Sequence, residues 1–208
     1  MLFARYGVDA VTVQQIVSAA GQRNNAALHY HFGSKDELVR QLVVDGAAVL
    51  DNRRQAMLKT INDRGGPSSI REILLVLVTP VIELGEDERW RGYIRFTSNL
   101  QSVHPDVMRS ALNHRWNAGY IKCFDHFKKM LPGSTALVEQ RLSIFAIYAN
   151  AILSAREAAL EKGRSKQSRL WDQAFTIENI LDTLEASLVC DPSNETRRIL
   201  NSVSGRSK

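Results

Sequence analysis

Residues Thr12 to Leu42 read TVQQIVSAAGQRNNAALHYHFGSKDELVRQL, the most informative segment of the chain. Its spacing predicts two short helices joined by a tight turn and followed by a third helix. Thr12 precedes an apolar run and Gln15 comes three residues later, which is the pattern of a capping box at a helix start. The apolar residues from Val13 to Ala20 then share one helical face. Gly21 follows directly, where a left-handed residue ends a helix.

The second half of this stretch predicts another short helix and another cap. Asn24 or Asn25 can cap a helix that runs to about His31. Ser34 and Glu37 have the spacing of a second capping box, which opens a longer helix with its apolar residues turned inward. Two short helices, a tight turn and a capped third helix are typical of a helix-turn-helix DNA-binding domain.

The most specific motif is Tyr30-His31-Phe32-Gly33-Ser34-Lys35-Asp36-Glu37-Leu38, which follows a small-residue-Gly turn and a short polar helix. With these elements in this order, the first 46 residues or so resemble the DNA-binding domain of the tetracycline-repressor (TetR) family. The remainder is similar to that family only in helical character and length. The resemblance implies an all-α fold with three parts: a helix-turn-helix domain at 1–46, a helical ligand-binding and dimerisation domain at 47–190, and a polar tail at 191–208.

The N-terminus departs from the family pattern. Met1 to Tyr6 looks like the last turn and a half of the family's first helix, which normally starts a dozen residues earlier. The sequence therefore predicts a truncated first helix stopped by Gly7. Such a stub would leave Leu28, Phe32 and Leu38 partly uncovered.

The candidates for reading DNA bases lie in and just before the second helix of the motif. Asparagine can pair bidentately with adenine, and arginine with guanine, in the major groove. The candidate residues are Arg23, Asn24, Asn25 and His29, with Gln22 as a further possibility. The alternative is that the two asparagines only cap the helix. The turn also looks one residue longer than in most of the family, so the assignment could shift by one.

Phosphate contacts position a DNA-binding domain without reading sequence. Thr12 and Lys35 are the best candidates because each lies at a helix N-terminus, where free N–H groups attract an anion. Tyr30 and His31 come next. For Tyr30, a ring packed inside the domain is an equally good interpretation.

The charge balance does not by itself demand nucleic acid. The chain has 27 Lys and Arg against 22 Asp and Glu, a net charge of +5. Residues 1–46 are neutral, with four cations against four anions. We therefore expect weak non-specific binding, so that specific binding depends on two copies acting together.

The rest of the chain predicts a series of helices. We expect one long helix from Ser34 to about Arg64 and a helix over Ile73–Leu84, kinked at Pro80, although its β-branched content also suits a strand. Further helices are expected at 87–103, 106–131, 136–161 and 168–189. The middle of 136–161 is apolar almost all round, and 168–189 has a clean apolar stripe. Such faces in a small domain predict a homodimer interface through these two segments.

The resemblance implies an unidentified, largely apolar effector bound among the body helices, which changes the spacing of the two DNA-binding domains. The aromatic residues of the body, with a few polar ones, could line such a pocket. An aromatic stripe at helical spacing is, however, more often plain core than a ligand site. The candidates are Trp90, Tyr93, Phe96, His104, Trp116, Tyr120, Phe124, Tyr148 and Asn150.

Other functions have little support in the sequence. No HExxH, GxSxG or Gly-rich phosphate loop appears, so we expect neither an enzyme nor a cofactor. Cys123 and Cys190 form no CxxC pair and predict no zinc site. No apolar run reaches the length of a membrane span, and the resemblance implies a bacterial cytoplasmic regulator, most often a repressor. Two alternatives stay open: a helical protein-interaction module that no longer binds DNA, and a small helical enzyme.

Overall fold

The computed structural model describes residues 2–113, 115–161 and 166–204, and these residues form helices and no strand. The all-α prediction is confirmed. The α-helices are α1 (Leu2–Ala10), α2 (Val13–Ala19), α3 (Ala26–Phe32), α4 (Lys35–Asp63), α5 (Ile70–Glu86), α6 (Tyr93–Val103), α7 (Pro105–Leu112), α8 (Ala118–Met130), α9 (Thr135–Glu161), α10 (Lys166–Trp171), α11 (Thr176–Val189) and α12 (Asn194–Ser204), and a short 3-10 helix spans Glu88–Trp90.

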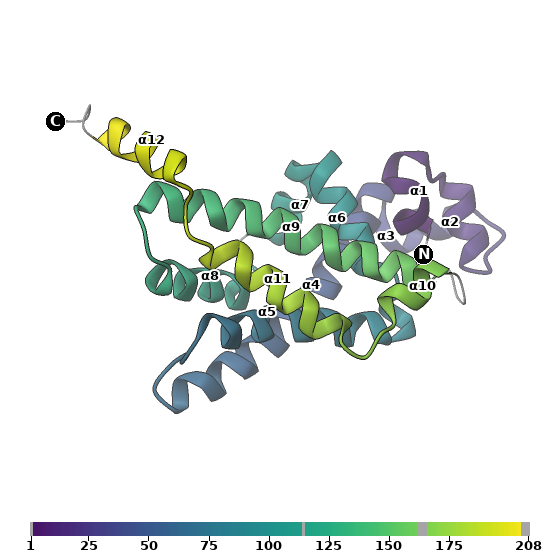
Figure 1. Cartoon of the computed structure of the whole chain (residues 1–208). Helices are drawn as coiled ribbons and strands as arrows, with labels where there is room; N and C mark the ends of the chain where they lie inside the picture. The colour runs from purple at the N-terminus through teal and green to yellow at the C-terminus, as the bar shows by residue number, and fades with distance from the viewer. Residues whose placement is uncertain (1, 114, 162–165, 205–208) are drawn as a thin grey trace.

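Helices α1 to α3 lie together at one end of the molecule, and α12 lies at the other (Figure 1). The first helix bends at Gly7, whose φ of 78° and ψ of 165° are not helical, and continues to Ala10. The predicted stop at Gly7 is therefore a break within α1. The exposure predicted beside a short first helix holds only for Phe32, which is 40% exposed, whereas Leu28 and Leu38 are buried.

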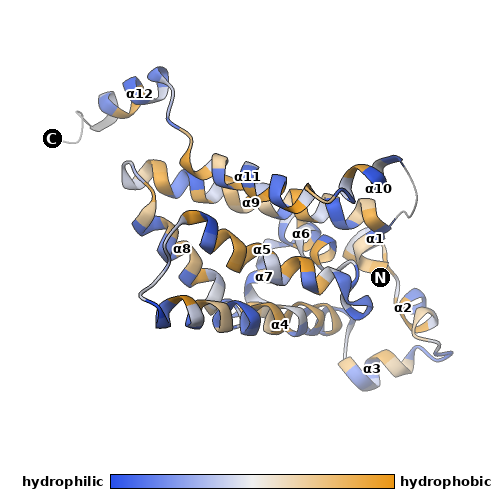
Figure 2. Ribbon diagram, turned by 60° about the horizontal axis from the view of Figure 1, so that its bottom comes forward, coloured by the Kyte–Doolittle hydropathy of each residue, from blue (hydrophilic) through white to orange (hydrophobic). Residues whose placement is uncertain are grey.

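The long helix α4 joins the N-terminal domain to the body. It packs against α5, α7 and α8, while α9 packs against α6 and α11. Because buried apolar residues from α1 to α11 form one continuous core, the DNA-binding end and the body share it rather than being separated by a linker. Figure 2 shows α2 and α3 standing out from the body, and α12 beyond its far end with mostly hydrophilic residues.

Three predicted helices are wrong in extent, because non-helical backbone interrupts each of them. The segment 87–103 is divided by Gly92, whose φ is 85°, into the 3-10 turn and α6. The segment 106–131 is divided into α7 and α8, with left-handed Asn113 between them. The segment 168–189 is divided into α10 and α11. The helix predicted through Pro80 does form, since α5 runs from Ile70 to Glu86 with Pro80 inside it.

Tyr93 of α6 packs directly over Gly46 of α4. A Cβ atom added to Gly46 would lie 2.2 Å from Tyr93 Cε2, so only glycine leaves room for the ring. The Tyr93 hydroxyl donates a hydrogen bond of 2.8 Å to the carbonyl oxygen of Val43. Burial of this phenol raises its pKa, which keeps the hydroxyl a neutral donor.

We predict that Gly46→Ala lowers the free energy of unfolding by about 1–3 kcal/mol, because the added methyl group overpacks a ring that is held by its own hydrogen bond. Gly85→Ala is the matched control within another helix, where the nearest atom to the new Cβ, Glu157 Oε1, is 4.0 Å away. Its stability should stay level or rise by up to about 1 kcal/mol through helix propensity. Urea denaturation measures both, and equal effects of the two substitutions would contradict the packing argument.

Candidate DNA-binding surface and ligand cavity

The helix-turn-helix forms with the caps that its sequence predicts. The Thr12 side chain accepts a hydrogen bond from the backbone N–H of Gln15, and Gln15 Oε1 accepts one from the N–H of Thr12. Gly21 ends α2 with a φ of 71°. The second predicted capping box, at Ser34, forms only in part. The Ser34 hydroxyl accepts a hydrogen bond from the backbone N–H of Glu37, but the Glu37 carboxylate lies beside Arg40 instead of accepting from the N–H of Ser34.

The two asparagines before α3 have different surroundings. Asn24 Oδ1 accepts a hydrogen bond from the N–H of Ala26 at 2.9 Å, so Asn24 caps the helix. The side chain of Asn25 makes no capping bond and is exposed. Gln22, Arg23, Asn24 and Asn25 share one concave surface with α2. Of the two asparagines, Asn25 is therefore the better candidate for base contact.

Tyr30 points away from the domain rather than into it. Its side chain is 85% exposed, so the interpretation as a packed ring is wrong. Its ring meets that of His31 edge-on, with centroids 5.0 Å apart. His29 is also exposed, but its Nδ1 lies 2.7 Å from the carbonyl oxygen of Gly33, which leaves Nε2 as the nitrogen free for DNA. The contacts of all three with DNA remain predictions.

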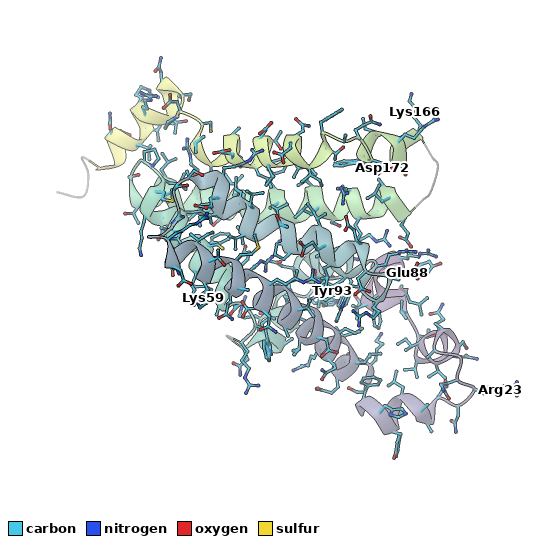
Figure 3. The ribbon with its side chains drawn as sticks, turned by 90° about the horizontal axis from the view of Figure 1, so that it is seen from below. Arg23, Lys59, Glu88, Tyr93, Lys166 and Asp172 are labelled. Atoms are coloured by element: carbon cyan, nitrogen blue, oxygen red, sulfur yellow. The ribbon has the colours of Figure 1, made fainter. Side chains whose placement is uncertain are left out.

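The cations of this domain are mostly engaged within the protein. Lys35 Nζ donates to the carbonyl oxygens of Val8 and Val11, each at 3.1 Å, and so fastens the end of α1 to the start of α4. Arg5 pairs with Glu161 on the body and Arg40 lies 3.7 Å from Glu37. Within residues 2–46, Arg23 alone among the cations has neither a hydrogen bond nor an ion pair. Figure 3 shows its side chain at the far tip of the domain.

A cavity of about 400 Å³ lies in the body, with α4, α6, α7 and α8 on its wall together with Asn150 and Leu153 of α9. Four of the nine predicted ligand residues line it: Tyr93, Trp116, Tyr120 and Asn150. The other five lie elsewhere. Phe96 and Phe124 pack in the aromatic core, Trp90 packs edge-on against Tyr93, Tyr148 packs at the core's edge, and His104 pairs with Asp9. For these five residues the core interpretation fits the structure better.

Sequence reasoning missed Arg54, which also lines this cavity. Its signal was present, because position 54 falls on the apolar face of α4 between Leu50 and Leu58. A charged residue within an apolar stripe is worth noting, since buried charges are rare unless they are paired.

Helix α6 connects the cavity to the DNA-binding end. Tyr93 at its start lines the cavity and bonds to Val43, while Phe96 one turn later stacks with Phe3 of α1 at a centroid distance of 5.8 Å. His104 at its end lies 2.9 Å from Asp9 of α1. A displacement of α6 by a molecule in the cavity would therefore act directly on α1.

The other side of α6 is fixed to α9 by two carboxylates. Glu157 accepts hydrogen bonds from the backbone N–H groups of Gly92 and Arg95, which caps the first turn of α6. Its burial raises its pKa, and these backbone bonds oppose the rise. Glu161 lies between Arg5 and Arg95 and bonds to both. The body thus holds α6 and α1 through the same end of α9.

This fold and this exposed surface define a helix-turn-helix DNA-binding protein with a helical body around a cavity. The family model described as "Bacterial regulatory proteins, tetR family" matches residues 1–42. Residues 1–42 therefore form the DNA-binding domain characteristic of the tetR family, and this domain indicates a DNA-binding transcriptional regulator.

Among solved structures, the chain is similar to the TetR family transcriptional regulator PfmR from Thermus thermophilus. The two share 17% sequence identity with a TM-score of 0.49, over 92% of this chain and 95% of that chain. No curated protein matches the sequence. The family assignment rests on residues 1–42.

We predict that Asn25→Ala and Lys35→Met impair DNA binding in different ways. Asn25→Ala should keep the melting temperature and relax preference at one base-pair position by about 1–3 kcal/mol, because a bidentate base contact is lost. Lys35→Met should weaken binding to all duplexes alike and lower the melting temperature, because it frees α1 from α4.

Fluorescence anisotropy measures the affinity of each variant for an operator selected from a random duplex pool and for the single-base-pair variants of that operator. Asn24→Ala is the matched control for Asn25→Ala, since it removes the helix cap and should cost about 1 kcal/mol of stability. Equal loss of specificity in the Asn25 and Lys35 variants would refute this division of roles.

Proposed function

We propose that this regulator is a homodimeric repressor that leaves its operator when a small, largely apolar molecule occupies the cavity of α4, α6, α7 and α8. The observation that carries the proposal is the direct connection between cavity and DNA-binding domain. Tyr93 lines the cavity and also contacts α4. The helix that it starts is followed by His104, which pairs with Asp9 of α1.

The dimer is proposed through α9 and α11, which lie side by side (Figure 1). On α9, Ile144 and Ile147 are 57% and 72% exposed, and Ala151 continues this exposed stripe. A continuous apolar face of this kind is typical of an interface between subunits. Pairing is also needed because the DNA-binding domain is neutral overall, so that one copy makes few phosphate contacts.

Helix α9 has a second interpretation. By length and composition alone it could cross a membrane, and 28% of its most apolar window is buried in a single copy. Such evidence is weak, because a core helix meets the same criteria. Arg141 and Glu157 anchor this helix to α11 and α6 through hydrogen bonds, which favours a helix that belongs to the bundle.

The experiment that tests the function is an anisotropy titration with duplex DNA from upstream of the chain's own gene, beside an unrelated duplex of equal length. Preference for the upstream duplex, together with higher expression of a reporter gene when the regulator is deleted, supports the repressor. Lower expression on deletion would make the protein an activator. Equal binding to both duplexes would favour the interaction-module alternative.

We predict that Ile147→Glu produces a monomer with an unchanged helical circular dichroism spectrum and an affinity for the operator that is weaker by about tenfold or more. A charge placed in the centre of an apolar interface is left without a partner, and dimer-dependent binding is lost with the dimer. Ile121→Glu is the control, because Ile121 is 43% exposed and lies on α8, which is not one of the two helices of the proposed interface. Light scattering measures the mass, and a dimer that survives Ile147→Glu would exclude this face.

A further inference from the structure

We propose that the cavity takes an amphipathic organic acid, whose single carboxylate pairs with Arg54 and whose apolar body fills the remainder. This inference rests on the proposed function in one respect, namely that the cavity is the effector site. It goes further in naming the chemical class of the effector.

Arg54 is a partly buried cation that makes one hydrogen bond with the described residues, so most of its hydrogen-bonding capacity is unused. Its Nε is buried without a hydrogen-bond partner, and one terminal nitrogen donates to the carbonyl oxygen of Leu77 at 3.1 Å. The guanidinium carbon lies 5.7 Å from the centre of the Tyr120 ring. Desolvation lowers the pKa of Arg54, which means that its surroundings disfavour the charge.

The one acidic side chain close by is already occupied. Asp51 is 2% exposed, and its two oxygens accept hydrogen bonds from the backbone N–H of Gly119 at 2.7 Å and from Gln55 Nε2 at 2.6 Å. It thereby caps the start of α8 and forms no ion pair with Arg54 among the described residues. The guanidinium is left without a carboxylate of its own.

The wall of the cavity offers no other negative charge. Its described lining contains neither Asp nor Glu. Burial raises the pKa of Tyr120 to about 12 and that of neighbouring Cys123 to about 12, so both are neutral near pH 7. Arg109, the second cation on the wall, is largely exposed and pairs with Asp106 at 3.1 Å. Arg54 is thus the one uncompensated charge in the described wall.

An arginine in this position selects for a flat, singly charged oxyanion. The planar guanidinium presents parallel N–H donors that match the two oxygens of a carboxylate. A dianionic phosphate would bring a second charge, for which the wall holds no second buried cation among its described residues. A neutral ligand would leave Arg54 as it is, and an ammonium ligand would be repelled.

The remainder of the cavity suits an apolar body. Leu50, Met108, Leu112 and Leu153 lie on the wall together with the rings of Trp116 and Tyr120. Trp116 has a φ of 57°, a strained backbone conformation for a bulky residue, and it forms the wall from the loop between α7 and α8. A volume of about 400 Å³ is near the small end of ligand cavities. A medium-chain or aryl-substituted acid would fit.

The test compares ligands that differ only in the head group. The probes are octanoate, octan-1-ol and octylamine, and 4-phenylbutyrate with 4-phenylbutan-1-ol. Calorimetry and the melting temperature of the free protein report binding without DNA. We expect each carboxylate to bind more tightly than its alcohol by about tenfold or more, because charge-assisted hydrogen bonds form only with the acid. Octylamine should bind most weakly.

Variants of neighbouring arginines locate the effect. Arg54→Met should abolish the preference for carboxylates while keeping alcohol affinity. The melting temperature of its ligand-free form should stay level or rise, since an unpaired and partly desolvated charge is removed. Arg53→Met is the matched control, because Arg53 is the preceding residue of α4 and pairs outward with Glu83 at 3.2 Å. It should keep the full preference. Arg54→Lys retains the charge without the planar fork and serves if the methionine variant does not fold.

The outcomes separate this inference from the function on which it rests. Three outcomes would overturn the proposal that the ligand carries a carboxylate paired with Arg54. These are equal binding of acids and alcohols, no binding by any carboxylate, and the same loss of carboxylate preference in the Arg53 and Arg54 variants. Carboxylate binding that depends on Arg54 supports the inference whether or not the operator is released. If the anisotropy of a preformed operator complex does not fall when such an acid is added, only the release step fails.

Discussion

The contact between Tyr93 and α4 is the constraint on which the arrangement of this protein depends. The ring occupies the space that a side chain at position 46 would take, and its hydroxyl reaches the carbonyl oxygen of Val43. The same ring forms part of the cavity wall, so the start of α6 cannot shift without disturbing α4 (Figure 3). Because α4 begins at the DNA-binding domain, one aromatic side chain belongs both to the cavity and to the support of that domain.

The polar contacts around α6 explain why it would move as a unit. Glu157 caps its first turn, and its last residues lead to His104, which pairs with Asp9 of α1. Arg5 and Arg95 share Glu161, so α1 and α6 are both tied to the end of α9. Exposed ion pairs contribute little stability individually. Here the ion pairs matter for geometry, because they fix the position of α1 relative to the body.

The starts and ends of the helices in the helix-turn-helix could be predicted because they depend on residues that are close together in the sequence. The Thr12–Gln15 box, the left-handed Gly21 and the start of α4 after Ser34 depend on side chains three or four positions apart. The breaks at Gly92 and Asn113 could not be predicted, since their left-handed backbone is fixed by what packs on each side. The same limit applies to the cavity, where Trp116 and Tyr120 line the wall while Phe124, one turn beyond Tyr120, packs in the core.

The buried Asp51 and the partly buried Arg54 show how α4 can serve both stability and recognition. Asp51 and Arg54 are three residues apart, which is the spacing at which helix residues usually pair with each other. Instead Asp51 accepts one hydrogen bond from the backbone N–H of Gly119 on α8 and another from Gln55 Nε2 on α4, which together satisfy its carboxylate. Arg54 is left to an aromatic ring and one carbonyl oxygen, a weaker set of partners for a full charge. Arg54 has no carboxylate partner among the described residues, although Asp51 is only three residues away. Its charge therefore disfavours the empty cavity and favours a state in which a bound anion pairs with it.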